Sequence, residues 1–214
     1  MSKRIFITAT NTDIGKTYTT KKLMQTYTKM GLKVGVIKPI ETGVADEAQD
    51  GEALLELLKQ CNPLLWHLDV EDVVPITYAL PAAPFVASKN KPLDLALILE
   101  KIEFMEASCD VLLIEGAGGL YVPIDSKTMM IDLIRKLDAV ALLVTHCSLG
   151  CINDTLLSHK ALESYGISHA IAFNCREEDV SFAEVSEPYF SHAKIDVMKV
   201  DSDIEKIAAA LYNL

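Results

Sequence analysis

The feature that most constrains the fold is a polar loop between an apolar run and a helical run near the start of the chain. The loop is Thr8 to Thr17, Thr-Ala-Thr-Asn-Thr-Asp-Ile-Gly-Lys-Thr. A loop that wraps nucleotide phosphates needs inward-pointing backbone N–H groups, a glycine for close approach, a lysine for the β/γ charge and a hydroxyl for Mg²⁺. Gly15, Lys16 and Thr17 supply the last three. The pattern predicts a strand, a phosphate-binding loop and a helix in succession.

The match to the strict pattern Gly-x-x-x-x-Gly-Lys-Thr is incomplete, because Thr10 stands where that pattern has its first glycine. A β-branched residue resists positive φ, so we expect an ordinary backbone conformation at Thr10. A Gly-Lys-Thr tripeptide alone is also compatible with a plain turn between a strand and a helix. Residues elsewhere in the chain must therefore decide between the two interpretations.

Length and charge limit the class of protein. The chain has 214 residues, half of them apolar, which is enough for one domain over residues 1–214. A net charge of −10 argues against a nucleic-acid or anionic-membrane partner, since either needs a basic face. The first apolar run ends at Thr8, too early for a secretory signal, and no stretch reaches the length of a membrane span.

The cysteines indicate the compartment. Their number is odd and their spacing scattered, which predicts reduced thiols in a cytoplasmic protein. A metal site at Cys147 and Cys151 beside His146 is the weaker alternative, because no second Cys/His pair with ligand spacing exists. The cysteines are Cys61, Cys109, Cys147, Cys151 and Cys175.

Apolar runs and helical periods alternate along the chain, which predicts a mainly parallel sheet with helices on both faces. The segment 63–92 contains several prolines, and we expect it to carry little regular structure. A final amphipathic helix over 202–214 should start at Ser202 or Asp203. The predicted strands are Arg4–Thr8, Lys33–Lys38, Val111–Glu115, Ala139–Thr145 and His169–Asn174, and the other helices are Thr17–Met30, Gly51–Gln60, Leu93–Ala107, Ile131–Lys136 and Ile152–Tyr165.

Ligands of an open parallel sheet gather beyond the carboxyl ends of its strands, so the residues at those ends matter most. Glu115 ends the apolar run from Val111, where a carboxylate could reach Mg²⁺ beside the phosphate loop. Three glycines follow at 116, 118 and 119, and they suit close approach of the backbone to a ligand. A merely solvated Glu115 would leave these glycines unexplained.

Three further positions are weaker candidates. Lys38, fixed at its base by Pro39, could neutralise charge on a transferring phosphoryl group, although an ordinary exposed lysine fits the pattern equally well. Asp50 precedes a helical run and could simply cap it. The turn Gly150 to Asn153 opens a helix whose free N–H groups could hold an anionic group.

Four motifs in this order, taken together, resemble the dethiobiotin synthetase family, and the match runs over nearly the whole chain. The family is a group of phosphate-loop (P-loop) NTPase-type α/β proteins that act as homodimers, with the substrate site near the interface. The motifs are Thr10-x-Thr-Asp-Ile-Gly-Lys-Thr17, Lys38-Pro-Ile-Glu-Thr42-Gly43, Glu115-Gly-Ala-Gly-Gly-Leu-Tyr-Val-Pro123 and Gly150-Cys-Ile-Asn-Asp-Thr-Leu-Leu157.

The resemblance implies roles for individual residues. Lys16 would bind the β/γ oxygens of ATP, and Lys38 would lie by the reacting carbamate and γ-phosphate, so both would be catalytic. Mg²⁺ would be held by Thr17, Asp50 and Glu115, and Asn174 would contact the nucleotide base. The remaining nucleotide contacts would be Asp13, Ile14, Gly15, Thr17, Tyr18, Glu115, Gly116, Ala117 and Gly118. The substrate contacts would be Thr42, Gly118, Tyr121, Leu149, Gly150, Cys151, Ile152 and Asn153, with the Gly150–Asn153 turn supplied by the neighbouring subunit.

The implied reaction is ATP- and Mg²⁺-dependent ring closure of 7,8-diaminononanoate with CO₂, through a carbamate and its phosphorylated form, to dethiobiotin. Two other classes use the same fold: a partitioning-type switch ATPase and a small-molecule kinase. The switch class usually carries an additional lysine early in the phosphate loop, and Thr10 to Ile14 contain none. A kinase would be distinguished by a stable phosphate ester as its product.

Three departures from the family pattern concern the nucleotide. Ala9 and Asn11 replace a glycine and an aspartate of the family's phosphate loop, and the segment 176–200 lacks the glycine and proline that usually frame the base-binding loop. We therefore hypothesise that the triphosphate is held mainly through its phosphates, with weak discrimination against GTP or CTP.

Overall fold

Five apolar runs form one parallel sheet in the computed structural model, which describes residues 2–214. Their order is β2-β5-β1-β6-β7, and every pairing between neighbours is parallel. Branched and aromatic residues of β1 and β5 are fully buried, so the middle of the sheet is the core of the molecule. The strands are β1 (Lys3–Ala9), β2 (Val34–Ile37), β5 (Val111–Gly119), β6 (Val140–His146) and β7 (His169–Asn174).

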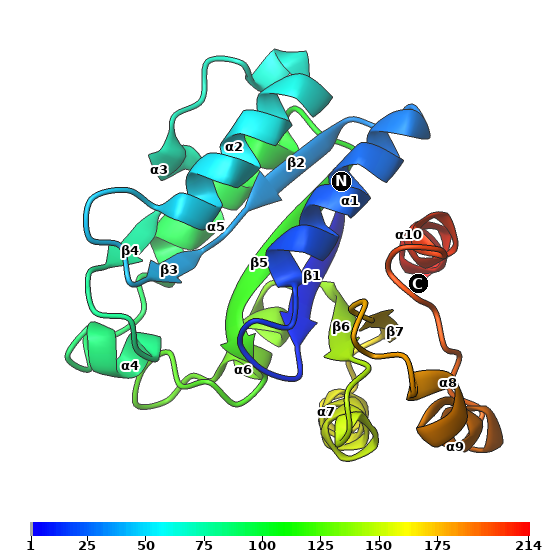
Figure 1. Cartoon of the computed structure of the whole chain (residues 1–214). Helices are drawn as coiled ribbons and strands as arrows, with labels where there is room; N and C mark the ends of the chain where they lie inside the picture. Colours follow the sequence, from blue (N-terminus) through cyan, green and yellow to red (C-terminus); the bar gives the residue numbers. More distant parts are fainter. Residues whose placement is uncertain (1) are drawn as a thin grey trace.

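Helices cover both faces of this sheet (Figure 1). Right-handed crossovers place helices on opposite faces according to the direction in which the next strand is added. One layer holds α1 (Lys16–Lys29), α2 (Gln49–Cys61) and α10 (Ile204–Asn213), and the other holds α5 (Leu95–Glu106), α6 (Met130–Lys136) and α7 (Cys151–Ser164). The predicted strands, helices and layering are confirmed, and Asp203 is the residue before α10, as expected.

Strand β5 departs from the expectation that it ends at Glu115, because it continues through Gly119. Its register against β1 shifts between Ile7 and Ala9, and Ala9 then pairs with Gly119. A Cβ on Gly116 would lie 2.6 Å from Phe6 Cε1, and one on Gly119 would lie 3.2 Å from the Ala9 carbonyl oxygen. Packing against β1 thus leaves no room for a Cβ at 116 and little room at 119, a reason that the sequence pattern did not reveal.

The proline-containing segment 63–92 has more regular structure than predicted. It contains a 3-10 turn η1 (Pro63–Leu65), α3 (Val70–Val73), β4 (Ile76–Tyr78) and α4 (Pro84–Ala87). Strand β4 pairs in parallel with β3 (Ile40–Thr42), which follows the Lys38–Pro39 turn. The expectation of little regular structure is wrong here, because elements of three or four residues are too short to show a period.

Two short helices after β7 were also missed, α8 (Phe182–Val185) and α9 (Glu187–His192). They are held by aromatic packing rather than by helical period. The ring of Phe173 in β7 lies 5.4 Å from that of Phe182 and 4.8 Å from that of Phe190, measured between centroids. Such aromatic contacts join residues of different elements, so they give no periodic signal within either segment of the sequence.

The expectation that every cysteine is a reduced thiol is wrong for one pair. Cys147 and Cys175 form a disulfide, with their Cα atoms 4.9 Å apart. They directly follow β6 and β7, which are neighbours in the sheet, so the topology brings together residues that the spacing does not relate. Cys61, Cys109 and Cys151 are free thiols.

Within residues 2–214, no helix combines the length and the apolar character needed to cross a bilayer.

Candidate active site

The loop between β1 and α1 has the backbone of a phosphate cradle. Gly15, the residue before α1, has a φ of 98°, and Asp13 has a φ of 59°, so left-handed residues alternate with ordinary ones just before the helix. Such alternation turns successive N–H groups toward one point. Thr10 is not among the described residues with positive φ, which confirms the expectation for that position. The Lys16 ammonium donates to the Asn11 carbonyl at 3.4 Å.

The buried carboxylate of Glu115 is the centre of the site. One of its oxygens accepts from the Thr17 hydroxyl at 2.7 Å and from the Lys38 ammonium at 2.9 Å. The other oxygen accepts from the Thr20 hydroxyl at 2.8 Å. Lys38 also forms an ion pair with Asp50. Residues from β5, α1, α2 and the turn after β2 thus meet in one charged network.

Burial and charge act differently on the two lysines. Burial lowers the pKa of Lys16, and the attraction of Glu115 only partly opposes it. Burial also acts to lower the pKa of Lys38, but Glu115 and Asp50 outweigh it, so the pKa of Lys38 is raised. Lys38 therefore remains an ammonium at neutral pH, held between two carboxylates.

A cavity of about 800 Å³ opens over this network at the carboxyl edge of the sheet. Its far wall comes from residues 81–84, within the segment that looked irregular in the sequence. The cavity brings together most of the predicted phosphate, metal and lysine positions and part of the predicted substrate set. These are Asp13, Gly15, Lys16, Thr17, Tyr18, Lys38, Thr42, Asp50, Glu115, Gly116, Ala117 and Gly118.

Other predicted residues lie outside this cavity. Leu149 and Tyr121 are 88% and 60% exposed, Gly150 is the residue before α7, and Cys151 is buried. The Ile14 carbonyl faces Asn174, whose amide donates to it at 2.8 Å. Ile152 and Asn153 are in the first turn of α7, where the Asn153 amide contacts Asp154.

Sequence reasoning missed two residues of the network. Thr20 lies one helical turn after Lys16 and Thr17, a spacing that could have indicated that its hydroxyl shares their face. Glu41 accepts from the backbone N–H groups of Asp50 and Gly51 at 3.1 and 3.0 Å. Glu41 therefore caps α2. The possible capping role of Asp50 is wrong, because Asp50 lies inside the first turn and its carboxylate faces Lys38.

The residues predicted for Mg²⁺ offer a suitable donor set. Thr17, Asp50 and Glu115 present one hydroxyl and two carboxylates, the hard oxygen donors that Mg²⁺ prefers. The three residues lie close together around Lys38. The Lys38 ammonium binds the carboxylates of Asp50 and Glu115, and the Thr17 hydroxyl donates to Glu115. Among residues 2–214, no group of three or more His, Cys, Asp or Glu side chains forms a metal cluster. The donor set fits Mg²⁺ only if ligands such as phosphate oxygens complete it.

Comparison with known families and proteins gives consistent matches. The AAA domain family model matches residues 3–208. The ATP-dependent dethiobiotin synthetase BioD of Sulfurovum sp. (strain NBC37-1) is 48% identical over 186 residues, covering 87% of this chain and 89% of that protein. The enzyme of the same name from Wolinella succinogenes is 38% identical over 98% of both chains. That from Methanocaldococcus jannaschii is 36% identical over 95% of this chain and 91% of its own.

Solved structures with the same fold are more distant in sequence. The MinC:MinD cell division complex of Aquifex aeolicus matches with a TM-score of 0.57 at 16% identity, over 97% of this chain and 85% of that one. A plasmid partition protein of Borrelia burgdorferi B31 bound to AMPPNP matches with a TM-score of 0.57 at 11% identity, over 99% and 97%. At this identity the likeness shows the P-loop NTPase fold.

Proposed function

The chain belongs to the ATP-dependent dethiobiotin synthetases, and we propose that the cavity over Glu115 is where it closes the ring of its substrate. It is a ligase of biotin synthesis that uses ATP. The observation that carries the assignment of the site is the convergence of Thr17, Lys38 and Glu115 beside a phosphate cradle.

The proposed reaction has three steps. One amine of 7,8-diaminononanoate attacks CO₂ and loses a proton, which gives a carbamate. A carbamate oxygen then attacks the γ-phosphorus of ATP, and ADP leaves. Finally the second amine attacks the carbonyl carbon, loses a proton and expels phosphate, which closes the cyclic urea of dethiobiotin. No step needs a nucleophile from the protein, so its contribution is position and charge.

Two ammonium groups supply most of that charge. The phosphate loop orients the triphosphate, with Lys16 near its β and γ oxygens. Lys38 directly follows β2 and lines the same cavity, where it can bind the carbamate and the transferring phosphoryl group. Its fixed position between Asp50 and Glu115 means that little reorganisation is needed when negative charge develops.

We include Mg²⁺ in the proposal. Thr17, Asp50 and Glu115 would hold it, directly or through water, because they are oxygen donors that line the cavity beside the phosphate loop. When bound, the ion neutralises charge on the β and γ phosphates. Thr20 then keeps the Glu115 carboxylate oriented through its own hydrogen bond.

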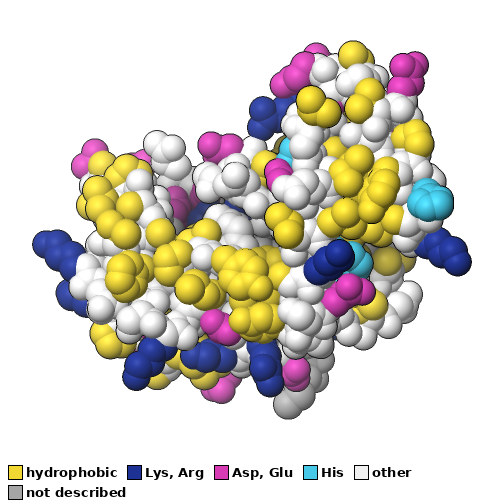
Figure 2. All heavy atoms as spheres, turned by 90° about the horizontal axis from the view of Figure 1, so that it is seen from below, with side chains coloured by type: hydrophobic (Ala, Val, Ile, Leu, Met, Phe, Trp, Pro, Cys, Tyr) yellow, Lys and Arg dark blue, Asp and Glu magenta, His cyan; other side chains and the backbone are white. Residues whose placement is uncertain are grey.

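We further propose a homodimer in which the Gly150–Asn153 turn of one subunit completes the substrate site of the other. Supporting this, the turn lies outside the cavity of its own chain, and the apolar side chains of Leu149 and Leu157 beside it are 88% and 63% exposed. Apolar side chains also gather on the face of the molecule that carries the strand tips (Figure 2). A second subunit would cover such side chains.

One incubation tests the proposal. The protein is mixed with Mg-ATP, bicarbonate and the diamine, and the products are identified by mass spectrometry. We expect the cyclic urea together with one ADP and one phosphate per ring closed. A stable phosphate ester of the substrate would instead indicate a kinase, and ATP hydrolysis that ignores the diamine would indicate a switch ATPase. Either result would overturn the proposed reaction.

A further inference from the structure

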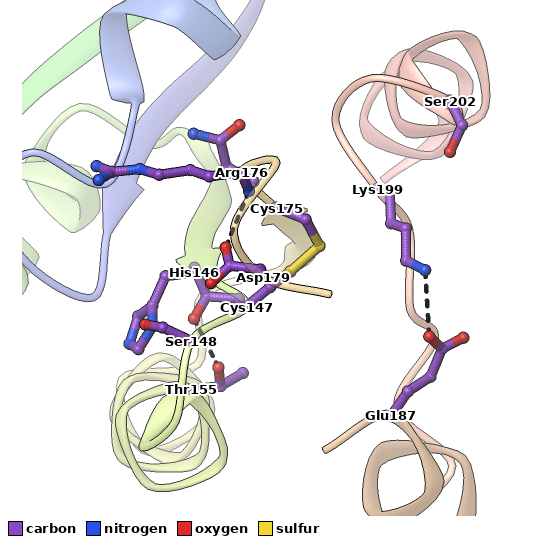
Figure 3. The surroundings of a disulfide bond; sticks show 12 residues. His146, Cys147, Ser148, Thr155, Cys175, Arg176, Asp179, Glu187, Lys199 and Ser202 are labelled. Carbon is purple, nitrogen blue, oxygen red and sulfur yellow. Dashed lines mark hydrogen bonds and ion pairs between the residues drawn. A yellow bond between two sulfur atoms is a disulfide. The ribbon is translucent and has the colours of Figure 1, made fainter. Parts of the chain in front are cut away.

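The last residue of β7 and the segment after it hold the phosphate loop from outside. The Asn174 amide donates to the Ile14 carbonyl at 2.8 Å, and the Arg176 guanidinium donates to the Asp13 carbonyl at 2.8 Å. Figure 3 shows the Arg176 side chain reaching from beside the disulfide toward that loop. Two consecutive carbonyls of the loop therefore have side-chain partners from one short segment.

These two contacts bear on how the cradle is formed. When N–H groups of a loop turn inward toward phosphate, the intervening carbonyls turn outward and need donors there. Asp13 has a φ of 59°, a left-handed conformation that most residues with a side chain adopt rarely. Asn174 is also pressed against the loop, since a Cβ on Gly15 would lie 2.1 Å from its amide nitrogen. Outside donors thus help to keep the loop in its binding conformation.

We propose that Arg176 is a positioning residue for the phosphate loop, an inference that rests on the proposed nucleotide site. Arg176 acts together with Asn174, and the Cys147–Cys175 disulfide anchors the backbone between them. We define the clamp as Asn174, Cys175 and Arg176. Arg176 holds the Asp13 carbonyl outward so that the loop amides face the phosphates. It contributes nothing to recognition of the base.

The base of the clamp is fixed on both sides. The Arg176 N–H donates to the Asp179 carboxylate at 2.9 Å, and the Asp179 N–H donates to the Arg176 carbonyl at 3.0 Å. Cys147, the other half of the disulfide, follows His146, whose ring contacts Ser148 at 2.6 Å and Asp154 at 3.1 Å. The disulfide thus connects the clamp to the end of β6 and the start of α7.

This arrangement makes the clamp sensitive to the redox state of the two cysteines. A dithiol such as dithiothreitol would transfer two electrons and two protons to the Sγ–Sγ bond, giving two thiols and the cyclic disulfide of the reagent. Cys175 then loses its covalent link to Cys147, and its backbone is held by the pairing of β7 up to Asn174 and by the Arg176–Asp179 hydrogen bonds. We expect both donors of the clamp to hold the loop less well in the reduced protein.

The first arm of the test measures the Kd of Mg-ATP and Mg-GTP by titration calorimetry. Arg176→Ala should raise both Kd values about three- to tenfold, because a charge-assisted hydrogen bond is lost at a partly solvated position. Arg176→Lys, which keeps a charged donor, should stay within about twofold of wild type. Glu178→Gln is the matched control, since Glu178 makes only an exposed ion pair with Arg176 at 4.0 Å, and it should change nothing.

The second arm uses the full chain with and without dithiothreitol, with free thiols counted by alkylation. Reduction should raise the Kd about two- to fivefold, and Cys147→Ser should show the raised value without responding to the reagent. Cys61→Ser, which removes a free thiol, should behave as wild type.

Failure of the clamp is distinguishable from failure of the nucleotide site. If wild type binds Mg-ATP and Arg176→Ala binds it equally well, the clamp is refuted while the site stands. A change in the ratio of the ATP and GTP Kd values would refute it too, because that result assigns Arg176 to base recognition. A lower melting temperature with an unchanged Kd would show a structural role only. Absence of nucleotide binding by wild type would refute both proposals.

Discussion

Two ion-pair networks lie at opposite edges of the sheet, and they differ in what they leave unsatisfied. At the edge where the strands begin, the Arg4 guanidinium binds the Glu106 carboxylate through two hydrogen bonds of 2.8 Å. Its third nitrogen, Nη1, donates to the Leu137 carbonyl at 3.0 Å. At the edge where the strands end, Lys38 lies between Glu115 and Asp50, and the Asp50 side chain is 47% exposed to the cavity.

The difference separates a structural pair from a reactive one. Arg4 and Glu106 use their hydrogen bonds on each other and on nearby groups and do not line the cavity over Glu115, so they stabilise the fold. Lys38 and its carboxylates border a cavity of about 800 Å³ and keep capacity for a ligand. Changes at the two networks should therefore separate activity from stability.

The largest expected effect is on turnover at the strand ends. Lys16→Ala and Lys38→Ala should each lower kcat by at least about 10³-fold, since each removes positive charge from the transferring phosphoryl group. The fold should persist, because Thr17 and Thr20 still donate to Glu115. Steady-state kinetics beside far-UV circular dichroism measures both, with the exposed Lys29→Ala as the control. Unchanged turnover in either variant would remove that lysine from the mechanism.

Glu115→Gln should lower turnover by about 10²-fold and raise the Mg²⁺ concentration needed for half-maximal rate, because the amide is a weaker ligand for the ion than the carboxylate. Titration of activity with Mg²⁺ measures this directly. Removal of Mg²⁺ with a chelator should abolish activity of the wild type. If Glu115→Gln showed the wild-type Mg²⁺ dependence, Glu115 would be a structural partner of Lys38 and no more.

Substitutions in the Arg4–Glu106 network should change the stability of the fold and leave turnover unchanged. The hydrogen bond from Arg4 holds the pKa of Glu106 below its usual value of 4.5. Because the folded pKa is depressed, the stabilisation is present above pH 4.5 and is lost as the pH falls through the folded value. Glu106→Gln should cost about 1 kcal/mol of unfolding free energy at pH 7 and less at pH 3. Denaturant unfolding at the two pH values checks this, and a loss of turnover in this variant would contradict the separation of roles.

The smallest effect on kcat/KM should come from exchanging the base of the nucleotide. If charge at the strand ends dominates binding, as the comparison implies, then kcat/KM for ATP, GTP and CTP should agree within about fivefold. Parallel kinetics with the three nucleotides measures it. Strict dependence on ATP would mean that a base-binding contact, near Asn174 or in the segment 176–200, carries much of the affinity.

The sequence predicted those parts of the site whose residues stand at the end of an apolar run. Lys38 and Glu115 each stand at the end of an apolar run, and parallel strands bring such ends to one edge. Lys16 and Thr17 open a helix with a recognisable loop before it. The topology therefore brings Thr17 and Lys38 to the Glu115 carboxylate, as its hydrogen bonds show, and Lys16 lines the same cavity.

The sequence could not predict contacts that depend on packing between distant segments. Gly116 and Gly119 were interpreted through ligand approach, whereas Phe6 and the Ala9 carbonyl explain them. The Cys147–Cys175 bond depends on β6 and β7 being neighbours, which no spacing encodes. Glu41 caps α2 from the preceding strand β3, and a three-residue strand gives no period to detect.

The most direct test of the account is a crystal structure of the protein with Mn²⁺ and a non-hydrolysable ATP analogue, in which the metal is located by anomalous scattering. We predict one metal peak between the triphosphate, the Thr17 hydroxyl and the carboxylates of Asp50 and Glu115, with the Lys16 and Lys38 ammonium groups on the γ-phosphate side. A metal bound elsewhere, or a triphosphate that lies away from Glu115 and Lys38, would contradict the account.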